Sequence, residues 1–265
     1  MPIALADLES LLRAHKLDRT LTSALPAPSC DELAVAATGL ASLDARLAGG
    51  FPRGQLSELV GPRSSGRTSL LRQTLAAATS RGELAALVDA LDAFDVESAA
   101  AAGIALDQLL WIRGHVVVDP GMCRDLNQRA VDQAIKALSL VLQAGNFSLV
   151  VLDVAEAPHE AIRRLPFTTW LRLQRMVEGT QTACVLVGTE SMARSSAGLT
   201  LRLGTGQAGL STPSSPSSLS SPSRPMCRFR GRLFEGLEVT ASVARARSHV
   251  REETTARFTT AAFNQ

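Results

Sequence analysis

The sequence predicts an α/β fold in which a mostly parallel central sheet is covered by helices. From residue 55 onward, short apolar runs alternate with helical patterns, as in repeated strand–helix units. The runs are continuously apolar rather than alternating, which is typical of strands covered on both faces. A glycine-rich turn, GPRSSGRTSLL at 61–71, joins the first run to the first helical pattern.

The predicted elements follow one another along the chain. The strands are the runs QLSELV, LAALVD, LLWI, SLVVLD and TACVLVG. Between them we expect helices over 67–80, 124–143 and 168–178, and an Ala-rich helix after LAALVD. Beyond Gly188, LTLRL at 199–203 and EVTASVARAR at 238–247 predict strands with no helix between them. We expect these to form an antiparallel extension at the C-terminal side of the sheet.

We expect the chain to be organised in four parts. Residues 1–30 carry leucines at helical spacing before a proline-rich break, and predict a helix and linker. Such a helix either packs on its own domain or docks on a neighbouring subunit or partner. The core spans 31–205, a disordered Ser/Pro-rich loop spans 206–225, and the strands and tail of 226–265 complete the core.

Composition narrows the classes of function. The 27 Lys and Arg residues against 25 Asp and Glu give a net charge of +2, so bulk charge does not indicate a nucleic-acid or membrane partner. The four cysteines stand far apart with no CxxC pair, which disfavours a zinc site. The first residues mix acids and bases among leucines, unlike a signal peptide. We therefore expect a cytoplasmic protein with no membrane association.

The turn after QLSELV matches the phosphate-binding loop motif GxxxxGK[ST], with arginine at the lysine position. Glycines let backbone N–H groups curl around phosphate oxygens, and the following helix contributes its positive end. The candidate nucleotide-binding residues of the loop are Gly61, Pro62, Arg63, Ser64, Ser65, Gly66, Arg67, Thr68 and Ser69. Thr68 and Asp153, the latter ending SLVVLD, are placed to hold Mg²⁺. The alternative is a structural turn with an ordinary strand-end aspartate.

Arg67 weakens the prediction that ATP or ADP binds with Mg²⁺. Lysine places a compact, flexible charge between phosphates, whereas arginine is a wider planar fork. We expect this exchange to impair catalysis more than binding.

Residues 37–110 resemble the RecA recombinase ATPase core nearly without gaps. The match includes TGLASLD, the GG-P-RG turn, the phosphate loop, and the second strand with its helix. It continues less closely to Asp153 and fades beyond Gly188. The resemblance implies a RecA-like P-loop core.

Carried over position by position, the resemblance implies a degenerate ATPase. The catalytic Glu of the family corresponds to Leu91, and a hydrocarbon cannot orient or deprotonate water. The Tyr that stacks on the base corresponds to Ser98, and the Gln that senses the γ-phosphate corresponds to Thr189. Asp95, which the family places near the base, is retained. We therefore assign no catalytic residue and expect the protein not to be an enzyme.

The basic residues that could contact DNA or a partner are few. The two DNA-binding loops of recombinases are shortened here to EAPHEAIRRLP and ESMARSSAG, which retain Arg163, Arg164 and Arg194. Their alternative is solvated surface arginine. Arg245 and Arg247 alternate along a strand and match the basic pair that recombinase filaments use across a subunit boundary. Such residues also occur on edge strands to block aggregation.

A RecA-like fold without its catalytic parts resembles the accessory proteins of mutagenic translesion synthesis, the ImuA group. This resemblance implies a role in the DNA-damage (SOS) response, with the recombinase RecA and an error-prone polymerase as partners. DNA binding and self-association are further expectations. One alternative is a DNA-stimulated ATPase in which Asp92 replaces the missing Glu. Another is a cell-division inhibitor that uses a reduced RecA-like fold, although the phosphate loop would then have no role.

Overall fold

The structure, a computed structural model, describes residues 34–114, 124–211, 233–246 and 255–261. These residues all lie in one compact unit, Ala34–Gln265. The predicted helix within 1–30, most of the Ser/Pro-rich loop and Arg247 lie outside the described residues. None of the described helices has the length and apolar character needed to cross a membrane.

The described part of the chain forms a central sheet in the order β11-β10-β8-β3-β7-β6-β4-β5, with β9 pairing with β10. The parallel strands are β3 (Leu56–Val60), β4 (Ala85–Asp89), β5 (Leu109–Arg113), β6 (Leu149–Asp153), β7 (Ala183–Gly188) and β8 (Leu199–Leu203). The antiparallel strands are β9 (Gln207–Ser211), β10 (Leu233–Ala246) and β11 (Thr255–Ala261). The predicted α/β class with an antiparallel C-terminal side is confirmed.

The antiparallel extension begins one strand later than the sequence predicts. β8, the predicted first antiparallel strand, runs parallel to β3, and only β10 reverses direction against it. The segment after β7 takes the chain across β3 to the strand position on its other side, without a long helix. It contains only a short 3-10 turn, η2 (Arg194–Ser196). β8 therefore runs parallel to β3 although no long helix precedes it in the chain.

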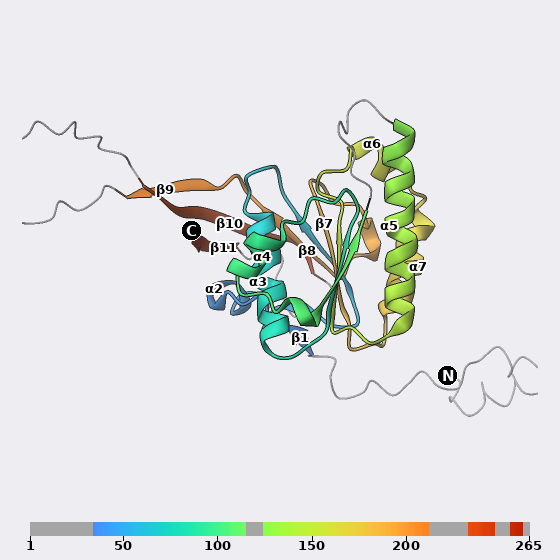
Figure 1. The fold of residues 1–265 in the computed structure, drawn as a ribbon, viewed down its shortest axis with the longest axis horizontal. Helices are drawn as coiled ribbons and strands as arrows, with labels where there is room; N and C mark the ends of the chain where they lie inside the picture. The colour runs from blue at the N-terminus through green and yellow to red at the C-terminus, as the bar shows by residue number, and fades with distance from the viewer. Residues whose placement is uncertain (1–33, 115–123, 212–232, 247–254, 262–265) are drawn as a thin grey trace, which may run out of the picture. The chain divides into compact units, whose positions relative to one another are not determined.

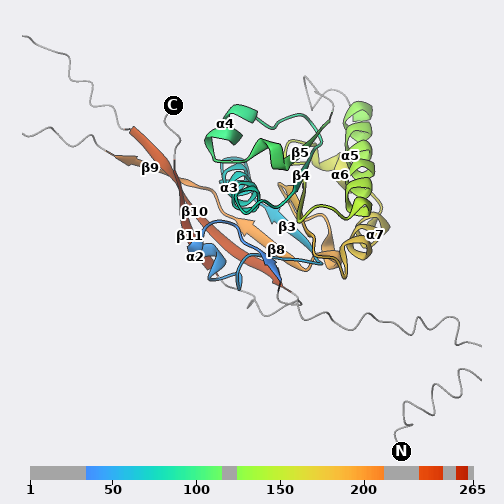
Figure 2. The same cartoon turned by 60° about the horizontal axis from the view of Figure 1, so that its bottom comes forward.

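Helices cover both faces of the sheet (Figure 1). One face carries α2 (Ala41–Asp44), α3 (Arg67–Ser80) and α4 (Val96–Ala101). The other carries α5 (Arg124–Ala144), α6 (His159–Arg163) and α7 (Phe167–Val177) (Figure 2). Central strands such as β3 and β4 are buried along their whole length, which fits their mainly apolar sequences, although β3 also buries Ser57 and Glu58.

The stretch AIRRLPFTTWLRLQR is divided between two helices, and the second of them, α7, confirms the helix predicted over 168–178. Pro166 stands between α6 and α7, and its ring cannot occupy a helix interior. α7 then buries Trp170, Leu173 and Val177 against the sheet. The bend leaves the end of α6 and the start of α7 facing the segment that follows β7, and a cavity lies among them.

Some small elements were not predicted. They are the short elements β1 (Val35–Ala36), β2 (Phe51–Pro52), α2 and η1 (Leu106–Gln108), together with β11 and β9. β9 lies at the start of the segment 206–225 that the sequence predicts to be a disordered loop. The two-residue strands and single helical turns are too short to show a periodic pattern. β1 and β2 pair antiparallel as a separate two-stranded sheet.

Candidate functional site

The predicted phosphate loop connects β3 to α3 and has two glycines that its packing requires. A Cβ on Gly61 would lie 2.7 Å from Ser65 Oγ and 2.8 Å from the Leu203 carbonyl oxygen. Gly66 caps α3 with a φ of 81°, and a Cβ there would lie 2.8 Å from Val239 Cγ2. Strands β8 and β10 therefore press the loop into its curled shape.

Two buried polar groups of this loop have no hydrogen-bond partner among the described residues. Ser65 is 1% exposed and Arg67 is 6% exposed, and the unpartnered atoms are Ser65 Oγ and Arg67 Nη1. Buried polar groups are nearly always hydrogen-bonded. The first turn of α3 also contains no acidic residue to offset the positive end of the helix dipole. An anion bound between these groups would supply the partners that the described chain does not.

The rest of the predicted loop is more open. Pro62, Arg63 and Ser64 are exposed, and so is Thr68, the candidate Mg²⁺ ligand. Ser69 is half-buried. Arg63 forms an ion pair with Glu156, which follows β6. That pair links the phosphate loop to the segment that begins at Asp153.

Asp153 lies at the end of β6, directly beside Asp89 at the end of β4. Part of Asp153 remains accessible, but its carboxyl group is desolvated, and this burial raises its pKa to about 6. The Ala155 N–H donates to Asp153 Oδ1 at 2.9 Å and opposes that rise, while the charge of Asp89 adds to it. Arg67 is close enough to attract Asp153, but burial dominates and lowers the pKa of Arg67.

Asp89 is a site residue that sequence reasoning missed. Its carboxylate accepts the Ala93 and Phe94 N–H groups at 3.0 and 2.8 Å, and Trp111 Nε1 at 3.4 Å. The signal was present, because LAALVD ends in aspartate as SLVVLD does. Parallel neighbouring strands bring such ends together.

The position of the family's catalytic Glu holds no acid. Leu91 packs against the apolar cluster on the α5–α7 face. Asp92 accepts two hydrogen bonds from Arg113, at 2.9 Å from Nε and 2.7 Å from Nη2. These bonds hold the pKa of Asp92 below its usual value. Arg113 in turn lies over the Trp111 ring, 4.7 Å from its centroid.

Asp95 and Ser98, the predicted neighbours of the base, bind each other. Asp95 is the N-cap of α4 and accepts the Ser98 N–H at 3.2 Å and the Ser98 hydroxyl. The hydrogen bonds from Ser98 lower the pKa of Asp95. The described contacts of this pair are thus those of a helix cap.

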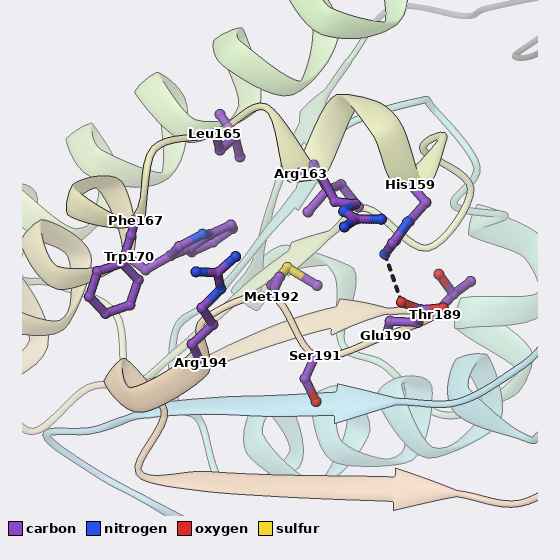
Figure 3. Close-up of a pocket in the computed structure, with 11 residues that line it drawn as sticks. His159, Arg163, Leu165, Phe167, Trp170, Thr189, Glu190, Ser191, Met192 and Arg194 are labelled. Atoms are coloured by element: carbon purple, nitrogen blue, oxygen red, sulfur yellow. Dashed lines mark ion pairs between the residues drawn. The ribbon is translucent and has the colours of Figure 1, made fainter.

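Of the predicted basic contacts, Arg163 and Arg194 converge on one cavity of about 320 Å³ (Figure 3). We call this cavity the arginine pocket, and it is also lined by His159, Trp170, Glu190 and Met192. Thr189, at the position of the family's Gln, forms part of its wall. Arg164 lines a separate cavity of about 260 Å³ on the other side of α6.

Arg245 contacts its own chain. It is half-buried on β10, and its Nη1 donates to the Arg194 carbonyl oxygen at 2.6 Å. Its predicted companion Arg247 lies outside the described residues. The described groups of His, Cys, Asp and Glu include no cluster of three or more that could hold a metal ion.

A curled, anion-oriented loop between a buried central strand and a helix of a parallel sheet places the protein in the class of P-loop α/β proteins. Within that class the match is specific, because residues 22–162 match the model of the RecA N-terminal domain. The chain belongs to the RecA family.

Individual RecA proteins are similar to part of the chain. The chain is 36% identical over 126 residues to Protein RecA of Clavibacter michiganensis subsp. michiganensis, a match that covers 47% of this chain and 31% of the relative. With Protein RecA of Chlorobaculum parvum it is 36% identical over 121 residues, covering 45% of this chain and 31% of the relative. The chain thus spans about a third of the length of these relatives.

The fold likeness extends further. A crystal structure of the RadB recombinase aligns with a TM-score of 0.55 at 21% identity, covering 85% of this chain and 96% of that chain. At this identity the likeness concerns the fold alone.

Proposed function

We propose that this protein is a RecA-like accessory protein of the DNA-damage response and translesion synthesis. It acts by association with a recombinase, an error-prone polymerase or the DNA that they occupy, and it hydrolyses little ATP. The observation that supports this proposal most is that neither residue 91 nor residue 92 provides a free catalytic base. Leu91 packs on the core, and the carboxylate of Asp92 is held by both nitrogen donors of Arg113. A carboxylate with a lowered pKa in a bidentate pair is a poor base.

We further propose that the phosphate loop retains anion binding. Arg67 Nη1 and Ser65 Oγ fit phosphate oxygens, since both are buried and lack partners within the described chain. ATP or ADP is the expected ligand. Thr68 and Asp153 would contribute to Mg²⁺ binding, but a carboxyl group with a pKa of about 6 beside Arg67 is a weaker partner for the ion than a free carboxylate.

Hydrolysis is measured as phosphate release from ATP with and without single-stranded DNA. We expect no turnover above background in the wild type. Turnover that disappears in Asp153→Ala would overturn the proposal and favour the DNA-stimulated ATPase. Leu91→Glu is the informative second variant, because it restores an acidic residue at the position of the RecA family's catalytic Glu.

Nucleotide binding is measured by titration of wild type beside Arg67→Ala. We expect the variant to bind ADP at least about tenfold more weakly, the loss of one buried charge-assisted contact. Arg129→Ala is the matched control, because Arg129 is an exposed arginine on the opposite face of the sheet. Equal affinity in all three proteins would exclude Arg67 from the site.

Association is measured by co-precipitation from extracts with the cell's recombinase and its error-prone polymerase. Binding to neither would exclude the accessory role. Capture of a cell-division protein instead would favour the inhibitor alternative.

A further inference from the structure

We propose that the arginine pocket binds a peptide segment of a partner protein in which a carboxylate adjoins a large apolar side chain. The proposal rests on the accessory function proposed above, and it names the surface and chemistry of that association. It is carried by three features of the pocket: a loop fixed by several elements, two arginines without ion pairs, and an apolar floor.

The loop after β7 is held to the sheet by hydrogen bonds to a buried glutamate. Glu58, in the centre of β3, is 1% exposed. Its Oε1 accepts the Met192 and Ala193 N–H groups, each at 2.7 Å, and its Oε2 accepts the Thr200 hydroxyl at 2.8 Å. Hydrogen bonds to a buried carboxylate are strong. The backbone on either side of Met192 is therefore held to the middle of the sheet.

The same loop is held at two further points and is locally strained. Arg245 of β10 donates to the Arg194 carbonyl oxygen at 2.6 Å, and His159 of α6 pairs with Glu190 at 2.7 Å. Arg194 has a φ of 49°, in the left-handed region that is unfavourable for a residue with a Cβ. Strain of this kind persists where surrounding contacts enforce it, and it is concentrated at functional sites.

The strained residue directs a cation into the pocket. Figure 3 shows Arg194 entering from this loop and Arg163 from α6, on either side of Met192. Among the described residues, neither guanidinium forms an ion pair. Glu190 is the pocket's one acid within that part of the chain, and it pairs with His159. The pocket therefore attracts an anionic group.

The floor of the pocket is apolar. Trp170, Met192 and Ile162 are 3%, 7% and 8% exposed, and Leu165 and Phe167 pack beside them. The accessible lining of the pocket is mostly polar, and Leu165 and Phe167 are its half-buried apolar residues. A volume of about 320 Å³ fits a large apolar side chain with a neighbouring carboxylate.

A peptide fits these features better than a nucleic-acid strand. A strand requires a track of successive cations and aromatic faces on which bases stack. Trp170 is too buried to offer a face on which a base could stack, and Arg164 lines a different cavity. One carboxylate between two arginines requires no such track.

The test measures fluorescence anisotropy of labelled peptide amides with the full chain. The probes are the peptide GSDLFG, its acid-free form GSNLFG, its apolar-free form GSDSSG, and an oligo-dT of matched length. We expect GSDLFG to bind at least about tenfold more tightly than either altered peptide. Arg163→Gln should lower that affinity by a similar factor, while the exposed-arginine control Arg129→Ala should leave it unchanged.

Arg194→Lys separates charge from geometry, because lysine keeps the charge but lacks the planar fork. We expect it to weaken binding less than Arg163→Gln does. Circular dichroism and thermal melting confirm that each variant is folded. Equal binding of all three peptides, or no binding, overturns the proposal. Oligo-dT binding that is lost in Arg163→Gln, without peptide binding, assigns the pocket to nucleic acid and also overturns it.

The two proposals fail separately. If wild type captures the polymerase or recombinase and Arg163→Gln captures it equally, the pocket proposal fails and the accessory role stands. If GSDLFG binds through Arg163 but neither protein is captured, the pocket stands and the accessory role fails.

Discussion

The phosphate loop and the loop of the arginine pocket follow adjacent parallel strands, β3 and β7, and both contain a non-glycine residue of positive φ. They differ in how their polar groups are satisfied. In the phosphate loop, Ser65 Oγ and Arg67 Nη1 are buried without a described partner. In the pocket loop, Glu58 and Arg245 bind the backbone on both sides of the arginine that enters the cavity. The first loop thus leaves two buried polar atoms for the ligand that we propose, whereas the backbone of the second is already bound by side chains of the same chain.

The largest expected effect is at Glu58. Glu58→Ala removes three hydrogen bonds and leaves two backbone N–H groups buried, which should lower the free energy of unfolding by about 3–5 kcal/mol. Arg67→Ala should change it by no more than about 1 kcal/mol, because Arg67 Nη1 has no described hydrogen bond and burial opposes its charge. Urea unfolding measures both. Equal losses would contradict the contrast between the loops.

The next effect is the pH dependence that Asp153 contributes. Its folded pKa of about 6 lies above the ordinary value of 3.8, so the folded state holds its proton more tightly than the unfolded state. Stability from this group is present below pH 4 and is lost as pH rises through 6, by up to about 3 kcal/mol.

Asp153→Asn removes this pH-dependent contribution to stability. In thermal melting in phosphate-free buffer, the stability of the variant relative to wild type should therefore increase between pH 4 and pH 7. A constant difference across that range would show that Asp153 is ionised with an ordinary pKa.

A smaller effect is expected at Gly66. Gly66→Ala must hold a φ of 81° and place a Cβ 2.8 Å from Val239 Cγ2, so we expect a loss of about 2 kcal/mol and weaker ADP binding. Gly82→Ala is the matched control, with a φ of 75° but nothing within 4 Å of the added Cβ. If both variants lose equally, packing against β10 does not shape the loop.

The smallest effect is expected at Arg194. Arg194→Gly relieves the positive φ and should raise the free energy of unfolding by about 0.5–1 kcal/mol, while it removes GSDLFG binding. Chemical denaturation and anisotropy give the two values. A variant that is less stable than wild type would show that the Arg194 side chain supports the fold rather than a ligand.

The sequence predicted the sheet and the phosphate loop because continuous apolar runs and a glycine motif are local signals. It could not give the direction of β8, since a strand buried on both faces has the same pattern whether parallel or antiparallel. Glu58 and Asp89 were missed because each lies within a strand pattern that is explained by packing. The convergence of Arg163 and Arg194 depends on the bend at Pro166, which lies close to Arg163 in sequence, and on contacts that Glu58 of β3 and Arg245 of β10 make with the loop of Arg194. These two contacts come from residues far from Arg194 in the sequence, so no local pattern reveals them.

Glu58 lies in the centre of β3 and Gly61 directly follows the strand, so one short stretch of chain supports both loops. The spacing between the two sites is therefore set by backbone length alone, at roughly 10 Å for three extended residues. Replacing Leu59 or Val60 with another apolar residue should alter neither site much. Inserting or deleting a single residue there would reverse the alternation of side chains and disable both sites together. The stretch thus tolerates changes of identity but not of length, and homologous chains that keep either site should preserve this interval.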